Sequence, residues 1–182
     1  MINLLLISVN KMKDITRREF MKIAGICALG SLFYPEVASA KRVSKEIIKK
    51  ILEPKLDPLT KKIIQIESNW DYWAKGKNGE IGLMQIQPNT LEEWNEHGSG
   101  RLYNKYDLFE PIVNVKIGKW YLHERIGEHY LPHYNLDVTD ENKAASYNAG
   151  PVRIGEIGDA VKNFYRLPKK TQNYLRKLQK LS

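Results

Sequence analysis

The sequence contains almost no cysteine: Cys27 is the only one among 182 residues. A chain with one cysteine cannot form an internal disulfide, so packing and hydrogen bonds must hold its fold. The sequence also lacks a stretch of about 18 apolar residues, so a membrane-spanning helix is not predicted. No histidines and cysteines occur with the spacing of metal ligands, and we therefore expect neither a metal nor another cofactor.

Acidic residues are fewer than basic ones, with 21 Asp and Glu against 29 Lys and Arg, a net charge of +8. Residues 41–182 alone hold 24 basic and 18 acidic residues, a net charge of +6. A basic protein is attracted to polyanions such as nucleic acid, anionic lipid or an anionic cell wall. Composition does not choose among these partners, and a solvated basic surface explains the charge equally well.

The first 40 residues have the layout of an export signal. A basic segment, 16–22, precedes an apolar stretch, 23–34, and the small residues Ala38-Ser39-Ala40 follow. This order is typical of a secretory signal with an A-x-A cleavage site. The pair Arg17-Arg18 resembles a twin-arginine signal, although an uncleaved anchor and a start at Met12 stay open. We expect export to the periplasm or cell envelope, with membrane contact only during export.

The remainder predicts a mainly α-helical fold with one small β-hairpin. A basic lead-in helix is expected over 41–57, and one larger domain over 58–182. Glycines at 76, 79 and 82 break any helix between 72 and 87 and favour turns and a short hairpin. Apolar spacing and capping residues predict further helices over 58–67, 88–97, 109–129, 140–147 and from about 168 or 171 onward.

Glu67 is the first candidate for chemistry. It lies four residues after Ile63 and eight after Leu59, so the three share one helical face. A carboxyl on an apolar face loses water, which raises its pKa and suits a general acid near neutral pH. Taken alone, such a glutamate is more often an ordinary residue at a helix edge.

Two later segments supply the polar and aromatic groups of a sugar site. Asn78-Gly79 favours a tight turn, and Gly82 permits a close backbone approach. Met84 and Gln85 then offer an apolar surface and an amide. Tyr147-Asn148 adds a ring and a second amide, suited to sugar hydroxyls and acetamido groups. Core packing and helix capping are the alternative explanations for these residues.

Together these residues resemble the catalytic domain of the soluble lytic transglycosylase (SLT) family, related in fold to goose-type lysozyme. The resemblance covers about 58–176 and implies a lysozyme-like α+β domain. Glu67-Ser68 matches the catalytic Glu-Ser of the family, and 82–85 with Pro88 and Thr90 matches its Gly-Leu-Met-Gln block. Residues 146–150 look like its Ala-Tyr-Asn-Ala-Gly block with Ser for Ala, and Thr171 and Tyr174 resemble a late Thr-x-x-Tyr element.

One position departs from the family pattern. Many members have a serine nine residues after the catalytic glutamate, and here that position is Gly76, flanked by Lys75 and Lys77. A hydroxyl contact to the substrate is therefore lost or supplied by another group. The departure bears on fine specificity more than on the class of reaction.

The resemblance implies a peptidoglycan lytic transglycosylase that cleaves the β-1,4 bond between N-acetylmuramic acid and N-acetylglucosamine. Glu67 would be the only acid and base, because the matched motifs hold no second carboxylate and Gln87 stands where goose-type enzymes often have Asp. Attack by the muramyl 6-hydroxyl would then give a 1,6-anhydro product. The substrate-binding residues implied are Ser68, Met84, Gln85, Tyr147, Asn148 and Tyr174.

Three other functions stay open at this point. A lysozyme-like hydrolase would use the same acid with a water, and Glu80 is the nearby acidic residue that could assist it. A non-catalytic wall-binding module would keep the fold without the reaction. A nucleic-acid binder is suggested by charge alone, and we expect none. The sequence leaves open whether the enzyme serves growth, recycling or a secretion or other wall-spanning machine.

Overall fold

The computed structural model describes residues 43–98 and 100–181, which divide into two compact units between Lys55 and Leu56. The described part of the first unit contains helix α3 (Lys45–Leu52) and the short 3-10 helix η2 (Glu53–Lys55). Ser44 caps α3, since its hydroxyl oxygen accepts the Ile47 N–H at 3.5 Å. The expected export signal over 1–40 lies outside the described residues.

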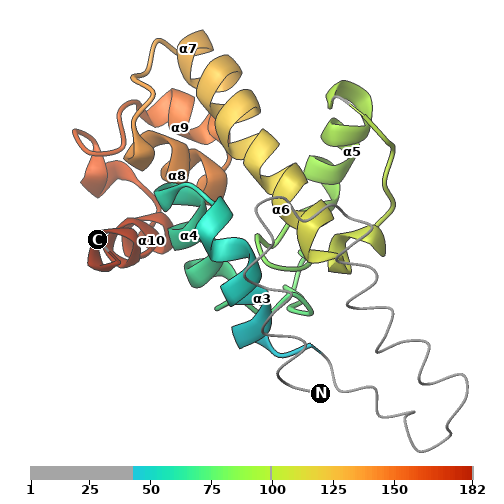
Figure 1. Cartoon of the computed structure of the whole chain (residues 1–182). Helices are drawn as coiled ribbons and strands as arrows, with labels where there is room; N and C mark the ends of the chain where they lie inside the picture. The colour runs from blue at the N-terminus through green and yellow to red at the C-terminus, as the bar shows by residue number, and fades with distance from the viewer. Residues whose placement is uncertain (1–42, 99, 182) are drawn as a thin grey trace, which may run out of the picture. The chain divides into compact units, whose positions relative to one another are not determined.

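The second unit is mainly helical, with loops between its helices (Figure 1). Its helices are α4 (Pro58–Glu67), α5 (Pro88–His97), η3 (Asp107–Phe109), α6 (Pro111–Trp120), η4 (Tyr121–Tyr130), α7 (Leu131–His133), α8 (Asp140–Ala149), α9 (Pro151–Ile157), η5 (Phe164–Arg166) and α10 (Lys169–Lys180). The mainly helical fold expected from the sequence is confirmed. The predicted bounds 58–67 and 88–97 coincide with those of α4 and α5.

The longest helical segment changes its hydrogen-bonding pattern in the middle. α6 continues as η4, a π-helix of ten residues, which then leads into α7. π-helical turns are rare and occur frequently at functional sites. The change begins at Tyr121, whose side chain lines the cavity described below.

The small β-hairpin expected between 72 and 87 is not confirmed. No strand forms within the described residues, and this loop has isolated antiparallel bridges of Lys75 with Ile81 and of Ile81 with Ile86. The backbone reverses too often for a longer ladder, because Gly79, Gly82 and Gln85 all have positive φ angles. The loop is therefore a chain of turns that places several side chains near the end of α4.

Helix α9 was not predicted from the sequence. Gly150 does end α8, with a φ of 90°, but Pro151 then starts a new helix instead of a loop. Proline is well suited to the first turn of a helix, where its missing N–H is not needed. The same residue therefore fits a helix end and a helix start equally well.

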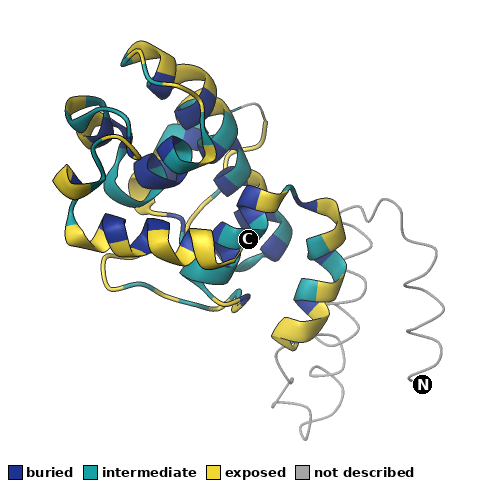
Figure 2. Cartoon of the chain, turned by 90° about the vertical axis from the view of Figure 1, so that its left-hand side faces the viewer, coloured by how far each residue is buried: buried dark blue, intermediate teal, exposed yellow. Residues whose placement is uncertain are grey.

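The core of the second unit lies between α4, α6, η4, α8 and α10. Its fully buried side chains include Ile63, Leu83, Met84, Ile117 and Leu122. Helix α10 packs against α4 and α8, and Figure 2 shows buried residues on one side of it and exposed residues on the other. Packing of this apolar stripe holds α10 beside the end of α4.

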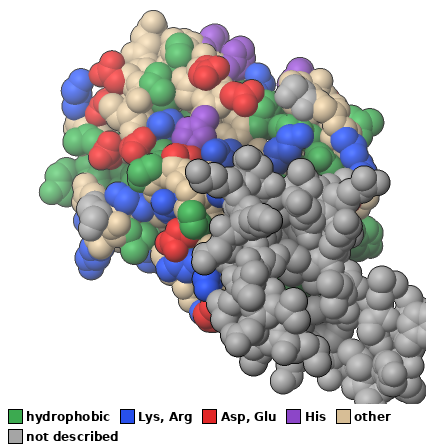
Figure 3. All heavy atoms as spheres, in the orientation of Figure 1, with side chains coloured by type: hydrophobic (Ala, Val, Ile, Leu, Met, Phe, Trp, Pro, Cys, Tyr) green, Lys and Arg blue, Asp and Glu red, His purple; other side chains and the backbone are tan. Residues whose placement is uncertain are grey.

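Positively and negatively charged side chains are interspersed on the face seen in Figure 3. Lys and Arg side chains alternate there with Asp and Glu instead of forming one basic patch. No helix in the described part of the chain is long and apolar enough to cross a membrane.

Candidate active site

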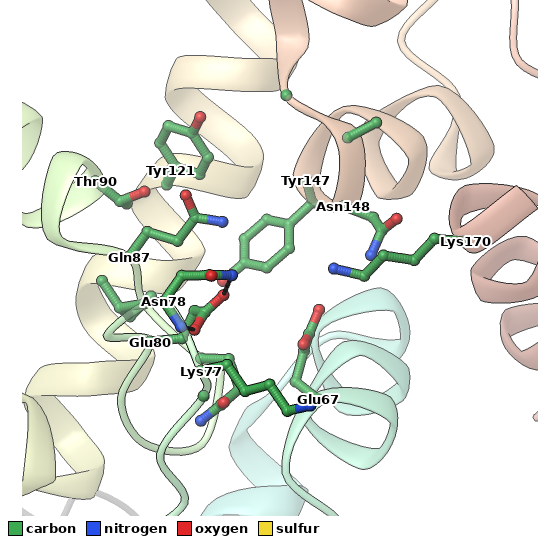
Figure 4. A pocket seen from close by; sticks show the side chains of 15 residues that line it. Glu67, Lys77, Asn78, Glu80, Gln87, Thr90, Tyr121, Tyr147, Asn148 and Lys170 are labelled. Carbon is green, nitrogen blue, oxygen red and sulfur yellow. Dashed lines mark hydrogen bonds between the residues drawn. The ribbon is translucent and has the colours of Figure 1, made fainter. Parts of the chain in front are cut away.

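A polar cavity of about 440 Å³ opens at the end of α4 (Figure 4). The 76–87 loop, the first turn of α5, the start of η4, the end of α8 and the start of α10 surround it. The residues that line it are Glu67, Gly76, Lys77, Asn78, Glu80, Gln85, Ile86, Gln87, Thr90, Tyr121, Tyr147, Asn148, Ala149, Gly150 and Lys170.

Glu67 is the last residue of α4, and the start of that helix is firmly fixed. Asp57 caps it by accepting the Thr60 N–H at 2.9 Å, and Leu59 and Ile63 bury its inner face. The Glu67 side chain extends from the helix end into the cavity (Figure 4). The structure therefore places this carboxyl at the end of α4 and in the cavity, and its role as a general acid stays a prediction.

Burial is the main reason why the pKa of Glu67 lies above its ordinary value. The like charge of Glu80 raises it further, while the Tyr174 hydroxyl and the ammonium groups of Lys170 and Lys177 lower it. A carboxyl with a raised pKa holds its proton to a higher pH than an ordinary glutamate does. A group of this kind is suited to donating a proton.

Two tyrosines lie beside Glu67: the half-buried Tyr147 and the buried Tyr174. Burial and the Glu67 charge raise the pKa of Tyr147 and of Tyr174 well above the ordinary value, so both hydroxyls stay neutral. Tyr147 donates its hydroxyl proton to the Met84 carbonyl oxygen at 2.7 Å. The Tyr174 hydroxyl makes no hydrogen bond of ordinary geometry within the described residues, although Glu67 is close enough to shift its pKa.

The 82–85 segment is held against α6 by Asn114, a residue that sequence reasoning missed. Asn114 is fully buried, and its side-chain oxygen accepts the Met84 N–H at 2.8 Å. Its amide nitrogen donates to the carbonyl oxygens of Ile81 at 2.8 Å and Leu108 at 2.9 Å. A single asparagine inside a helix gives no sequence signal of such a role.

Gln85 lines the cavity, and its backbone has a positive φ of 48°, which is a strained conformation for a residue other than glycine. Its side-chain nitrogen donates to the carbonyl oxygens of Gly82 at 2.9 Å and Ala74 at 3.2 Å. Non-glycine residues with positive φ are uncommon and often occur where a site requires them. Gln85 therefore stabilises the loop through its side-chain nitrogen, and its side-chain oxygen is left for the cavity.

Met84 and Ser68 do not reach the cavity. Met84 is fully buried, and its sulfur packs against Gly118 of α6, where a Cβ would collide with it. Ser68 caps α4 and donates its hydroxyl proton to the Ile64 carbonyl oxygen at 3.2 Å. The roles implied for them as substrate contacts stay predictions, and their positions favour packing and capping.

The predicted Tyr-Asn and Thr-x-x-Tyr elements meet across α8 and α10. The buried Thr171 hydroxyl donates to the Asn148 side-chain oxygen at 3.0 Å, which leaves the Asn148 amide nitrogen directed toward the cavity side. Lys170 precedes Thr171 and lines the cavity. The structure thus brings Glu67, Gln85, Tyr147 and Asn148 together around one space.

Two lining residues, Tyr121 and Lys170, were not anticipated from the sequence, because a lone tyrosine or lysine carries no signal of a site. Lys77, Asn78, Gln87 and Thr90 also line the cavity, and the sequence singles them out only as parts of a turn or of the family pattern. In the described part of the chain, no group of three or more His, Cys, Asp or Glu is arranged to hold a metal ion. The carboxyl, tyrosine and amide groups that line the cavity can transfer protons and form hydrogen bonds.

Comparisons with known proteins agree on one family. A family model described as "Transglycosylase SLT domain" matches residues 45–173. The chain is 32% identical over 94 residues to a candidate soluble lytic murein transglycosylase of Haemophilus influenzae, covering 52% of this chain and 15% of that protein. It is 32% identical over 68 residues to the membrane-bound lytic murein transglycosylase E of Buchnera aphidicola, covering 36% and 31%.

A solved structure gives the same fold. The lytic transglycosylase Slt of Pseudomonas aeruginosa, an inactive glutamate-to-glutamine mutant, aligns with a TM-score of 0.57 at 23% identity, covering 79% of this chain and 23% of that one. At this identity the likeness concerns the fold. The chain spans less than a third of the length of each of these proteins.

Proposed function

We propose that this chain, which belongs to the transglycosylase SLT domain family, is a peptidoglycan lytic transglycosylase. One observation carries the proposal: a half-buried carboxyl of raised pKa, Glu67, projects into a cavity lined by tyrosines and amides. The names of the relatives from Haemophilus and Buchnera support murein as the substrate. The proposed domain is 58–182, and the loop at 72–87 would be the β element of a lysozyme-like fold.

In the proposed first step, Glu67 protonates the oxygen of the β-1,4 bond between N-acetylmuramic acid and N-acetylglucosamine. The C–O bond to the muramyl anomeric carbon breaks, and the N-acetylglucosamine end leaves with the new hydroxyl. Positive charge develops at the anomeric carbon, and the acetamido oxygen of the same muramyl residue can stabilise it. The Asn148 side-chain nitrogen and the Gln85 side-chain oxygen are available to orient that acetamido group.

In the second step, Glu67 is ionised and takes the proton from the muramyl 6-hydroxyl. The 6-oxygen then bonds to the anomeric carbon, which gives a 1,6-anhydro ring and restores the proton on Glu67. No water is consumed. The attacking group is tethered to the sugar, and such tethering can lower a barrier by up to about 7–11 kcal/mol in ideal cases.

Replacing Glu67 with glutamine tests the proposal. The amide has the volume of the acid but cannot donate the proton, so we expect at least a ~100-fold slower release of soluble fragments from purified peptidoglycan. Circular dichroism should show an unchanged fold. Digestion at the parental rate by a folded Glu67→Gln protein would contradict the proposal. Binding of the parent protein without any release would instead favour a wall-binding module.

We also propose that the enzyme acts in the periplasm or cell envelope. The basic, apolar and small-residue order of residues 1–40 supports export, and a wall substrate would be met there. We further propose a role beside a secretion or other wall-spanning machine. The small size of the domain supports it, because a small enzyme fits local opening of the wall.

A further inference from the structure

Gly76 and Glu80 form one structural unit in the wall of the cavity that holds Glu67. The Gly76 N–H donates to the Glu80 carbonyl oxygen at 2.8 Å, which closes the turn between them. A Cβ placed on Gly76 would overlap the Glu80 carboxylate. Gly76 is not among the glycines with positive φ, so this position needs glycine for space and not for backbone conformation.

The Glu80 carboxylate is fixed by Asn78 (Figure 4). Its Oε2 accepts the Asn78 backbone N–H at 2.8 Å, and its Oε1 accepts the Asn78 side-chain amide at 3.0 Å. Hydrogen bonds from its own backbone N–H and from Asn78 outweigh burial and lower the pKa of Glu80. The group is therefore a fixed negative charge facing the cavity.

Charges of both signs act on Glu67 from the elements packed around it. Lys170 and Lys177 of α10 favour its ionised form, as does the Tyr174 hydroxyl, while Glu80 of the loop opposes them. Tyr147 of α8 is the further titratable neighbour, and it stays neutral. Burial is the largest contribution that keeps the proton on Glu67, and the negative charge of Glu80 adds to it by offsetting part of the pull of the two lysines.

We propose that Glu80, seated over Gly76, is a positioning residue of the reaction, whose negative charge keeps the proton on Glu67 against Lys170 and Lys177. The proposal rests on the proposed function, because Glu80 acts through Glu67 as the acid. It also explains the departure at position 76. A serine there would take the space of the Glu80 carboxylate, so this chain has a carboxylate where many relatives have a hydroxyl.

The test is the pH profile of peptidoglycan digestion by Glu80→Gln. Without the negative charge, Glu67 loses its proton at lower pH, so the alkaline limb of the profile moves to lower pH. We expect the rate on that limb to fall about three- to ten-fold relative to the parent, with an acid plateau within about two-fold. Glu128→Gln is the matched control, since it removes one exposed carboxylate of η4 away from the cavity.

Gly76→Ser provides an independent route to the same result. The serine displaces the Glu80 carboxylate while the charge stays in the protein, so the alkaline limb should move in the same direction. The double variant Gly76→Ser with Glu80→Gln should move it no further than Glu80→Gln alone. Circular dichroism at the assay pH values confirms that each variant is folded.

Two results would overturn the inference. One is a Glu80→Gln profile that coincides with the parent profile, and the other is an equal loss of rate at every pH in a folded variant. Either result leaves the proposed function intact if Glu67→Gln remains inactive. If Glu67→Gln is active, the proposed function fails, and the pH profile of Glu80→Gln no longer bears on it.

Discussion

Glu67 makes the stability of the folded protein depend on pH. Burial raises the pKa of Glu67 in the folded protein above the ordinary value of 4.5. At a pH between these two pKa values, the folded protein holds a proton on Glu67 that the unfolded chain has released. The stabilisation from this proton is fully present below the ordinary pKa and is lost as the pH rises through the folded-state pKa. Above that range, the buried charge destabilises the fold.

A neutral side chain at position 67 should remove this pH dependence. We expect Glu67→Gln to have a melting temperature at or above that of the parent at about pH 8, with the difference disappearing near about pH 4. Thermal unfolding followed by circular dichroism at both pH values measures it. A clearly lower melting temperature for Glu67→Gln at about pH 8 would show that the ionised carboxylate stabilises the fold.

At the scale of single residues, the sequence predicts helix faces better than side-chain directions in turns. Glu67 could be placed because its spacing from Leu59 and Ile63 follows a regular helix. Met84 could not, because the direction of its side chain depends on a loop with positive φ at Gly82 and Gln85. The spacing of apolar residues along the sequence does not indicate which loop residues have positive φ angles.

At the scale of elements, Asn114 joins α6 to the 82–85 segment through hydrogen bonds to Met84, Ile81 and Leu108. Asn114→Ala would leave these buried backbone groups without a partner, and we expect a loss of about 2–4 kcal/mol in the free energy of unfolding. Activity should fall as well, because the Met84 carbonyl oxygen holds Tyr147. Urea unfolding and digestion assays measure the two effects.

The control for that prediction is Asn173→Ala, which changes an exposed asparagine whose side chain contacts Arg176 on the surface of α10. Equal stability of Asn114→Ala and Asn173→Ala would show that the contacts of Asn114 do not stabilise the loop.

The starts and ends of helices were largely predictable from the sequence. The change from α-helical to π-helical hydrogen bonding inside the longest helical segment was not. Asp57-Pro58 and Thr139-Asp140 carry clear start signals, and α4 and α8 begin there. The π-helix from Tyr121 to Tyr130 has no such signal, because an apolar stripe fixes which face is buried and not which carbonyl each N–H bonds. For the same reason, the sequence did not predict that Tyr121 lines the cavity.

At the scale of the whole molecule, the net charge of +6 over residues 41–182 should strengthen binding to an anionic wall polymer. Salt screens such attraction. We expect Glu67→Gln, used so that the substrate stays intact, to sediment with purified sacculi several-fold less at about 500 mM than at about 50 mM NaCl. Binding that does not change with salt would assign recognition to the cavity alone.

The chemical form of the new sugar ends tests the central claim most directly. The parent protein is incubated with purified peptidoglycan in ¹⁸O-water, and the released muropeptides are analysed by mass spectrometry. Intramolecular attack at the Glu67 site predicts 1,6-anhydromuramyl ends without heavy oxygen. Reducing ends that carry ¹⁸O would show that water attacks instead, and would contradict the lytic transglycosylase mechanism.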